Sequence, residues 1–555
     1  MKKLLSAGEI LAIILFALVP VFLSFPYRIN IFLSWEGAYR MAEGQIPFKD
    51  FGMPVGYMYW VIPAIFFKIF GAQLITLIKA QAFINILSGL AFRSIFVSLR
   101  VPYQARFIGV LVFVLSYSFP NYWPWYNHTV IVYQFISLAF LLKFLTGSQT
   151  RRSYFLLFLS AFFIFCSFFT KQDGGGLGLL ICLALLVYEG ISAKKWLPLG
   201  AFVGMVVVSA LIIMLPVSGS GLSYWFNHGQ PPHSSRISIT DILGEFLKAS
   251  FWIKFYLMMA ILFLIVLMKN TKEFFADKYQ VLLFFVTLGI LAEASIFQVT
   301  SYVPEDNNFF FHSFGVVFLL TMLIRMLPID INNTRNLLIT TAAILLWWSN
   351  TYWNYLDRFI LKTGQKEFAT MEYQGYHYAT EVNKNTFMIE LDTTEIPMHE
   401  WSTPPLKAFE RMLLPNPTVE GINRLMEMPL VKQAGIKVLN MTELTPLAKE
   451  IPFELETGSH YPLWYHKGVA MFDKETQMFV DRIAEGYYDL VLFEYIPYLN
   501  NFYPFAVREA LEKHYQKVDS FTAPRKPTKY AWVEVYVKPR PSGNTIPEEG
   551  EISPE

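Results

Sequence analysis

Hydrophobic positions divide the chain into two parts of different character. From Gly8 to about Leu356, long apolar stretches alternate with polar segments, whereas the sequence after Asp357 is mixed. Eleven stretches meet or approach the length of about 18 apolar residues that crosses a bilayer as a helix: 8–26, 73–92, 104–120, 128–147, 153–170, 175–191, 196–216, 250–268, 279–299, 309–328 and 337–355. The pattern predicts a polytopic α-helical membrane protein with about 11 transmembrane helices, the first of which is retained rather than cleaved as a signal peptide.

Basic residues predict the orientation of these helices. If the N-terminus is cytoplasmic, the cytoplasmic loops and helix ends contain more Lys and Arg than the outer ones, among them Arg151, Arg152 and Lys195. The positive-inside rule favours this orientation. An odd number of helices then places the sequence after Asp357 on the outer side, together with a first outer loop over residues 27–72.

The second part of the chain is predicted to form a soluble extracytoplasmic α/β domain over residues 358–540. Short strands and helices are predicted at 436–440, 474–484, 489–494, 504–515 and 532–537. Their alternation favours an α/β layer over the membrane domain of residues 1–357. Residues 541–555 are rich in Pro, Glu and Gly and are predicted to be disordered.

Composition agrees with this division and excludes several classes of protein. Of 555 residues, 54% are apolar, 17% are aromatic and only 16% are charged, and the mean hydropathy is +0.38. Soluble domains carry about 25% charged residues. The net charge of +2 is too small to suggest a polyanionic partner such as a nucleic acid. Cys166 and Cys182 lie in apolar runs, so they predict neither a disulfide framework nor a zinc site.

The first outer loop contains the most informative pattern in the chain. Residues 34–44 predict a short amphipathic helix, with aromatic residues on one face and Glu36 and Arg40 on the opposite face. The next aromatic segment, residues 57–68, is predicted to lie as a helix at the level of the lipid headgroups. The long polar segments are predicted to lie on this side of the membrane, which favours chemistry or binding on the outer face.

This loop resembles the first outer loop of the GT-C superfamily, which comprises integral-membrane glycosyltransferases that use lipid-phosphate-linked sugars. It is similar to that of bacterial members related to the aminoarabinose transferase and the protein O-mannosyltransferases. The matching residues are Glu36, Gly37, Tyr39, Gly44, Pro47, Phe48, Asp50, Phe51, Phe70 and Gly71. Many members open the loop with two adjacent acids, whereas Trp35 holds the first of these positions here. The resemblance implies a GT-C-like membrane domain and a multi-pass protein of the bacterial inner membrane.

The resemblance also implies a reaction, the transfer of a sugar from a polyprenyl-phosphate donor to an acceptor hydroxyl on the outer face. A carboxylate must take the acceptor proton, because alcohols are poor nucleophiles. Cationic or hydrogen-bonding groups must stabilise the departing phosphate. Glu36 is the first candidate for the base, and Asp50 is the second. Glu36 can instead pair with a basic residue one helical turn away, and Asp50 can cap a turn.

Cations near the outer side are the candidates for binding the donor phosphate. Lys171, at the outer end of the fifth predicted helix, is the first candidate, although its ammonium can also simply extend to the interface. The further candidates are Arg40, Lys79 and His312. The residues for possible substrate binding are Glu293, Trp123, Tyr126 and His128. An aromatic belt and a satisfied polar contact are the structural alternatives for this last group.

Two other functions are compatible with the sequence. A transporter or flippase of a lipid-linked substrate would place ionisable residues deep in several helices. A non-catalytic membrane assembly protein would need no convergent carboxylates and lysine. The run Gly174–Gly176 lacks the residues of a nucleotide-binding loop. No cofactor is predicted, because the histidines have no metal-ligand spacing. A requirement for a divalent metal ion is left open by the sequence. The predicted partners are a polyprenyl-phosphate sugar donor, a glycan, lipid or protein acceptor, and membrane lipids.

Overall fold

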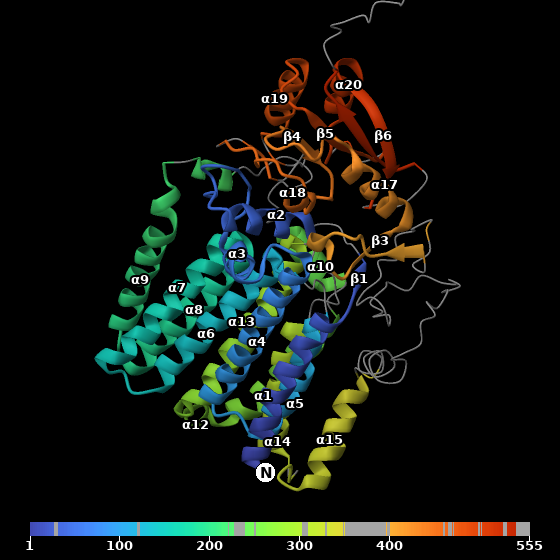
Figure 1. Ribbon diagram of the computed structural model, residues 1–555. Helices are drawn as coiled ribbons and strands as arrows, with labels where there is room; N and C mark the ends of the chain where they lie inside the picture. The colour runs from blue at the N-terminus through green and yellow to red at the C-terminus, as the bar shows by residue number, and fades with distance from the viewer. Residues whose placement is uncertain are drawn as a thin grey trace, which may run out of the picture.

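A computed structural model of the chain shows a bundle of helices with a strand-containing C-terminal region stacked on one end (Figure 1). The N-terminus lies at the opposite end of the bundle. The structure describes residues 1–26, 31–118, 123–219, 221–226, 239–248, 251–301, 309–327, 330–347, 349, 396, 400–458, 461–463, 469, 471–497, 500, 502–524 and 530–539. The predicted disordered tail, 541–555, lies outside these residues.

All eleven predicted stretches contain helices, which confirms a polytopic α-helical membrane protein. Among the described residues, eight helical segments are long and apolar enough to cross a membrane, and they contain α1 (Lys2–Leu18), α4 (Leu74–Ser98), α6 (Tyr126–Thr146), α7 (Tyr154–Thr170), α8 (Gln172–Ala193), α9 (Leu197–Met214), α11 (Phe251–Leu267) and α13 (Lys278–Ser301). The other predicted stretches form the shorter apolar helices α5 (Tyr103–Phe113), α14 (Phe309–Met326) and α15 (Thr334–Trp347). The number of spans therefore stays a prediction.

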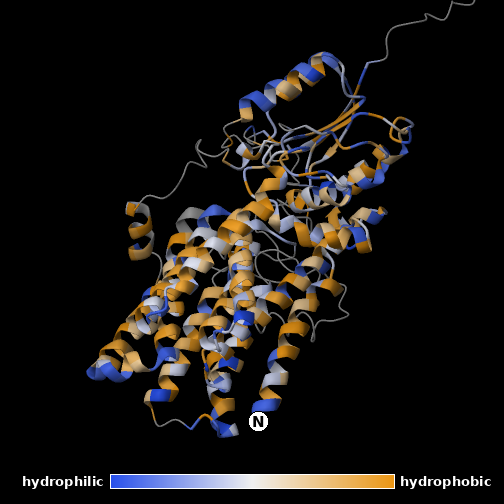
Figure 2. Ribbon diagram, turned by 90° about the vertical axis from the view of Figure 1, so that its left-hand side faces the viewer, coloured by the Kyte–Doolittle hydropathy of each residue, from blue (hydrophilic) through white to orange (hydrophobic). Residues whose placement is uncertain are grey.

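Burial separates central helices from peripheral ones. In the most hydrophobic part of α4, α6 and α13, 72%, 83% and 72% of the residues are buried inside the protein, whereas the values for α9 and α11 are 22%. A helix that is apolar all round needs either protein or lipid around it. Figure 2 shows mainly hydrophobic residues along the helices of the bundle and a mixture of hydrophobic and hydrophilic residues in the C-terminal region. Helices α4, α6 and α13 therefore form the middle of the bundle.

Glycines let α8 approach its neighbours closely. A Cβ atom at Gly178 would lie 2.7 Å from the side chain of Gln134 on α6, and one at Gly174 would lie 2.8 Å from the Phe297 ring on α13. At Gly175 it would lie 2.2 Å from main-chain atoms of Phe168 on α7. Small residues four apart are the usual means of close packing between membrane helices. The glycine run that lacks a nucleotide-binding pattern thus serves helix packing.

Two short helices of the first outer loop lie between the bundle and the C-terminal region (Figure 1). Helix α2 (Ile31–Ala42) is almost entirely buried, and it ends near Gly44, whose positive φ of 93° a side chain would disfavour. Helix α3 (Met58–Phe70) buries one face and leaves Ile65 and Ile69 exposed. Both helices were predicted, although α2 begins three residues earlier than expected.

The C-terminal region contains a four-stranded sheet in the order β4-β5-β7-β6. Strands β4 (Val438–Met441) and β5 (Leu490–Tyr495) are parallel, and β7 (Trp532–Val537) is antiparallel to both β5 and β6 (Gln516–Thr522). Helix α19 (Phe472–Ala484) connects the parallel strands, and α20 (Phe505–His514) precedes β6. The predicted strands and helices are confirmed. The sequence did not predict β6, an edge strand whose first residues are polar and exposed.

A smaller sheet ties the two parts of the chain together. Strand β1 (Phe25–Pro26), which follows the first helix, pairs in parallel with β3 (Met412–Pro415), and β3 pairs with β2 (Trp401–Ser402). Helices α17 (Asn416–Glu427) and α18 (Leu447–Glu450) follow along the chain. The Arg411 guanidinium also donates to the main-chain oxygen of Val21 at 2.7 Å. The C-terminal region is therefore docked at the end of the bundle that bears α2 and α3.

We predict that this end faces away from the cytoplasm. Cys166 and Cys182 are fully buried, so single cysteines can be introduced as topology probes. A membrane-impermeant maleimide should label Glu509→Cys, on α20, in intact cells. It should label Arg152→Cys, in the loop at the far end of the bundle, only after permeabilisation. The reverse pattern would show that the orientation is inverted.

Candidate active site

Glu36 and Arg40 form a shielded ion pair on α2. The Arg40 Nε and Nη2 atoms lie 2.9 and 2.8 Å from Glu36 Oε1. The side chain of Arg40 is only 1% exposed, and that of Glu36 is 16% exposed. Ile31, Trp35 and Ala38 are buried at helical spacing, which fixes the helix against its neighbours. The i, i+4 spacing predicts this pair. Because the pair is buried, each charge depends on its partner far more than it would on a solvent-exposed helix.

The remaining contacts of Arg40 reach across to other segments. Its Nη1 atom donates to Gln45 Oε1 at 2.9 Å and to the main-chain oxygen of Glu456 at 2.7 Å. The rings of Phe51 and Tyr461 lie 5.6 and 5.0 Å from the guanidinium carbon. Arg40 is therefore enclosed between the first outer loop and the C-terminal region.

Asp50 supports a tight turn in the same loop. Its Oδ2 atom accepts a hydrogen bond of 2.7 Å from the main-chain nitrogen of Ile46. Phe48, within this turn, has a φ of 66° and is held there by its buried ring against Tyr57 and Phe169. A non-glycine residue at positive φ persists only where its surroundings enforce it. The turn-capping alternative is thus realised for one carboxylate oxygen of Asp50.

Lys171 lies in the sharp bend between α7 and α8, where it is the N-cap residue of α8. Its ammonium is 3.4 Å from Asp173 Oδ2 and lies over the rings of Tyr126 and Phe297 at 5.6 and 5.2 Å. The side chain is 17% exposed. The first N–H groups of α8 point out of the same end of the helix, and a helix N-terminus attracts anions. Asp173, in the first turn of α8, already supplies one negative charge at this bend, and Lys171 stays a candidate for binding a phosphate.

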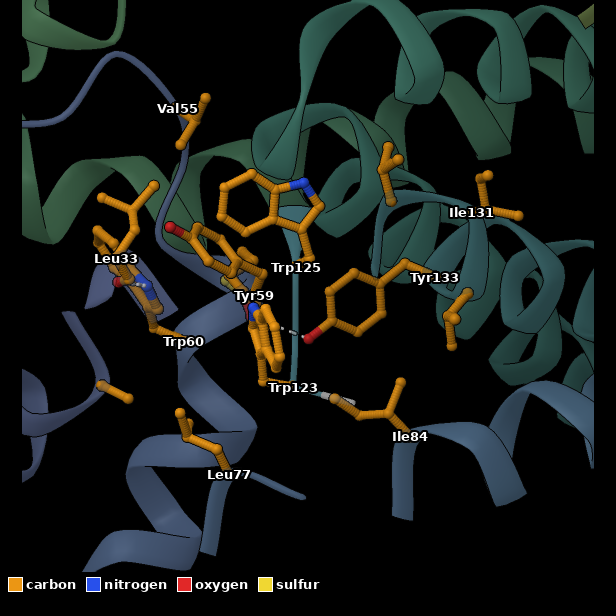
Figure 3. Packing of buried hydrophobic residues seen from close by; sticks show 14 of the residues in the cluster. Leu33, Val55, Tyr59, Trp60, Leu77, Ile84, Trp123, Trp125, Ile131 and Tyr133 are labelled. Atoms are coloured by element: carbon orange, nitrogen blue, oxygen red, sulfur yellow. Dashed lines mark hydrogen bonds between the residues drawn. The ribbon is translucent and has the colours of Figure 1, made fainter. Parts of the chain in front are cut away.

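A continuous run of ring contacts joins the Glu36–Arg40 pair to Lys171. This run of rings is called here the aromatic layer. Figure 3 shows its centre, with Tyr59 and Trp60 of α3 near Trp123 and Trp125. A Cβ atom at Gly37 would lie only 2.0 Å from the Trp60 ring, so α2 rests directly on this layer. The consecutive separations are 5.6 Å for Arg40 and Phe51, 5.7 Å for Phe51 and Trp60, 4.7 Å for Trp60 and Tyr59, 6.0 Å for Tyr59 and Tyr126, and 5.6 Å for Tyr126 and Lys171.

Two other candidates for phosphate binding have contacts that involve neither Glu36 nor Lys171. The Lys79 ammonium, on α4, lies 5.7 Å from the centre of the Phe70 ring. His312, on α14, stacks at 4.0 Å on Trp252 and lies 3.4 Å from the Tyr256 hydroxyl, both on α11. These contacts place Lys79 beside α3 and His312 between α14 and the peripheral helix α11.

Three candidates for substrate binding are buried near the aromatic layer or below it. Glu293 is 1% exposed on α13, and its Oε2 atom accepts a 2.5 Å hydrogen bond from the Gln134 amide. His128 is 4% exposed, with its Nδ1 atom 3.3 Å from Gln81 Nε2. Trp123 is 1% exposed. The sequence did not single out Gln81 and Gln134 as partners of His128 and Glu293. Without knowledge of the packing, a glutamine inside the bundle cannot be distinguished from one at a helix end.

A further contact that the sequence did not reveal joins three segments. The Tyr224 hydroxyl donates to Glu475, which is 4% exposed on α19. The Tyr224 ring also covers Gly52, where a Cβ atom would lie 2.6 Å away. Trp225 stacks on Phe169 at 5.0 Å, next to the bend that holds Lys171. The segment around Tyr224 is therefore clamped between the first outer loop, α7 and the C-terminal region.

Within the described ranges, no three His, Cys, Asp or Glu side chains gather closely enough to hold a metal ion.

No protein-family model matches the chain, and no curated protein sequence matches it. Among solved structures, the chain is similar to ArnT from Cupriavidus metallidurans bound to undecaprenyl phosphate, with 11% identity, 66% of each chain covered and a TM-score of 0.39. It is similar to the arabinofuranosyltransferase AftD from Mycobacteria, with 13% identity, 97% of this chain and 40% of that chain covered, and a TM-score of 0.42. It is also similar to the Archaeoglobus fulgidus oligosaccharyltransferase, with 11% identity, 96% and 73% covered, and a TM-score of 0.40.

The chain spans 66% of the length of the ArnT chain and 40% of that of AftD. Because each TM-score is below 0.5, we base the functional proposal on the residues of this chain.

We predict that Glu475 makes the stability of the docked C-terminal region depend on pH. Burial raises the pKa of Glu475 from 4.5 to about 7. Between these values the folded protein keeps a proton that the unfolded chain has lost, so the stability from this group falls as the pH rises toward 7 and levels off above it. At pH 8 the Glu475→Gln variant should be more stable than the wild type by about 3 kcal/mol, with little difference near pH 4.5.

Melting temperatures in detergent, measured from pH 4.5 to pH 8, test this prediction. Glu485→Gln, at an exposed position just after α19, is the matched control and should follow the wild type. An equal offset between Glu475→Gln and the wild type at both ends of the range would contradict the prediction.

Proposed function

We propose that this protein transfers a sugar from a polyprenyl-phosphate donor to an acceptor hydroxyl at the end of the bundle beneath the C-terminal region. The observation that supports this most is the aromatic layer, which joins a shielded carboxylate, Glu36, to an ammonium at a helix N-terminus, Lys171. A base and an anion-binding group are the two functions that the reaction requires. The donor class follows from the resemblance of the first outer loop.

In the proposed reaction, the acceptor hydroxyl gives its proton to Glu36 as its oxygen attacks the anomeric carbon of the donor. The bond between that carbon and the phosphate oxygen breaks, and polyprenyl phosphate leaves with the electron pair. Lys171 and the first N–H groups of α8 would stabilise the negative charge on the phosphate. Asp50 is the second candidate for the base, since one of its oxygens is already used within the turn.

The position of the C-terminal region supports a role in binding the acceptor. It packs directly on the loop that holds Glu36, so it lies close to this carboxylate. We propose a hexosyl or pentosyl group as the transferred sugar, and a glycan, lipid or protein as the acceptor. The proposed location is the outer face of the bacterial inner membrane.

One observation favours the alternative of a transporter or flippase. Glu293 is buried inside the bundle, hydrogen-bonded to Gln134, and an ionisable residue within a membrane is a candidate for function by default. Substrate movement across vesicles that contain the purified protein, without any sugar transfer, would favour this alternative.

We predict that Glu36→Gln lowers sugar transfer by about a hundredfold or more, because general-base catalysis contributes about 10² to 10⁴ to the rate. The assay measures transfer from a panel of polyprenyl-phosphate sugars by the purified protein. Glu43→Gln is the matched control, since Glu43 is exposed and directly follows the same helix. Unchanged transfer by Glu36→Gln would remove Glu36 from the mechanism.

We also predict that Lys171→Ala weakens the binding of polyprenyl phosphate by about tenfold or more, as expected for the loss of a hydrogen bond to a charged group. The measurement is the Kd for polyprenyl phosphate in detergent micelles. Lys49→Ala, at an exposed position of the first outer loop, should bind as the wild type does. Equal affinities for both variants would exclude Lys171 as the phosphate-binding group.

A further inference from the structure

Four donor contacts of the Arg40 guanidinium are made within the protein. An arginine has five N–H donors in a planar fork. Nε and Nη2 face Glu36, while Nη1 donates to Gln45 and to the main-chain oxygen of Glu456. Aromatic rings approach the guanidinium, and only 1% of the side chain is exposed. Because the guanidinium is buried and most of its donors contact the protein, Arg40 is poorly placed to bind a phosphate.

Several contacts from the C-terminal region to this loop come from one short segment, residues 455–458 and 461–463, called here the docking segment, while Ala448 and Lys449 of α18 contact Tyr39 of the same loop. It forms main-chain hydrogen bonds on both sides of Gly52, from Gly52 N to Tyr461 O at 2.8 Å and from Leu463 N to Gly52 O at 2.9 Å. Gly458 N donates to Asp50 O at 2.8 Å, and the Gln45 amide donates to Leu455 O at 3.3 Å. The docking segment thus follows the first outer loop like an added strand.

The docking segment is in turn fixed to the core of the C-terminal region. The Glu456 carboxylate contacts Arg482 of α19 and accepts a 3.0 Å hydrogen bond from the Tyr488 hydroxyl. Tyr515 links this site further, since its hydroxyl lies 2.7 Å from the main-chain oxygen of Tyr488. A chain of polar contacts therefore connects the sheet of the C-terminal region to the carboxylate of Glu36.

We propose that Arg40 is a positioning residue that orients Glu36, and that the docking segment orients Arg40. In this arrangement the C-terminal region completes the site, because it sets the geometry of the base in the membrane domain. Both contacts from Arg40 are to Oε1 of Glu36, so Oε2 is the oxygen that would accept the proton in this proposal. The inference rests on the proposed function of Glu36 and replaces phosphate binding as the role of Arg40.

Substitution of Arg40 by lysine separates the two roles. Lysine keeps the positive charge and can bind a phosphate, but it lacks the fork that holds the carboxylate. With the full-length protein, Arg40→Lys should lower kcat about a hundredfold, since misplacement of a catalytic group by about 1 Å has an effect of this size. The Kd for polyprenyl phosphate should change less than about twofold. Retained kcat, or a Kd weakened by tenfold, would overturn the proposal.

A second variant tests the link from the C-terminal side and decides the question if Arg40→Lys does not fold. Tyr461→Leu removes the ring beside the guanidinium but leaves the main-chain pairing with Gly52. We expect kcat to fall about tenfold with unchanged donor affinity. Wild-type kcat in Tyr461→Leu would overturn the role of the docking segment.

The control is Arg411→Lys, which alters another arginine between the two parts of the chain. It should leave kcat and donor affinity unchanged, so a similar loss of kcat would show a general effect of weakened docking and would overturn the proposal. Full activity of Glu36→Gln would instead disprove the proposed function itself. Inactive Glu36→Gln together with active Arg40→Lys would disprove only the positioning role.

Discussion

A guanidinium removed from water requires compensating charge and hydrogen bonds, and Arg40 obtains them from three residues. Glu36 supplies the charge, Gln45 supplies an amide oxygen and Glu456 supplies a carbonyl oxygen. Leaving such a buried ion without its partner costs about 3–5 kcal/mol. The ion can therefore be accommodated only when the first outer loop and the C-terminal region are assembled around it. Burial of this one charge makes the two parts of the chain depend on each other.

The aromatic layer provides the second constraint. Rings such as Tyr59 and Trp60 are fully buried at the boundary between the bundle and the C-terminal region. Large rings bury much apolar area and also offer polar edges, so they suit this boundary. The layer gives the charged groups a rigid base that excludes water, which strengthens electrostatic interactions above it. The layer therefore explains why the Glu36–Arg40 ion pair, whose residue types are typical of an exposed surface, is shielded from water here.

Much of the architecture could be predicted because it follows from local properties of the chain. The long helices are apolar over their whole length, and the strand Leu490–Tyr495 is a continuous buried run. The i, i+4 spacing of Glu36 and Arg40 predicted their contact. What could not be predicted joins residues that are far apart, such as Arg40 with Glu456 and Tyr224 with Glu475. Their side chains carry no periodic signal, and only the packed structure shows which are buried.

Pairing between β1 and β3 has a consequence for the biogenesis of the protein. Phe25 and Pro26 emerge from the ribosome at the start of synthesis, but their partners, Met412 and Leu413, emerge more than a dozen helical elements later. At a translation rate of about 5–20 residues per second, the delay is about 20 to 80 seconds. Throughout this time Phe25 and Pro26 lack their strand partners, and Arg40 lacks its contact with Glu456. A nascent chain arrested before β3 would thus expose unpaired main-chain groups and a charged residue, which quality-control proteases and chaperones can recognise.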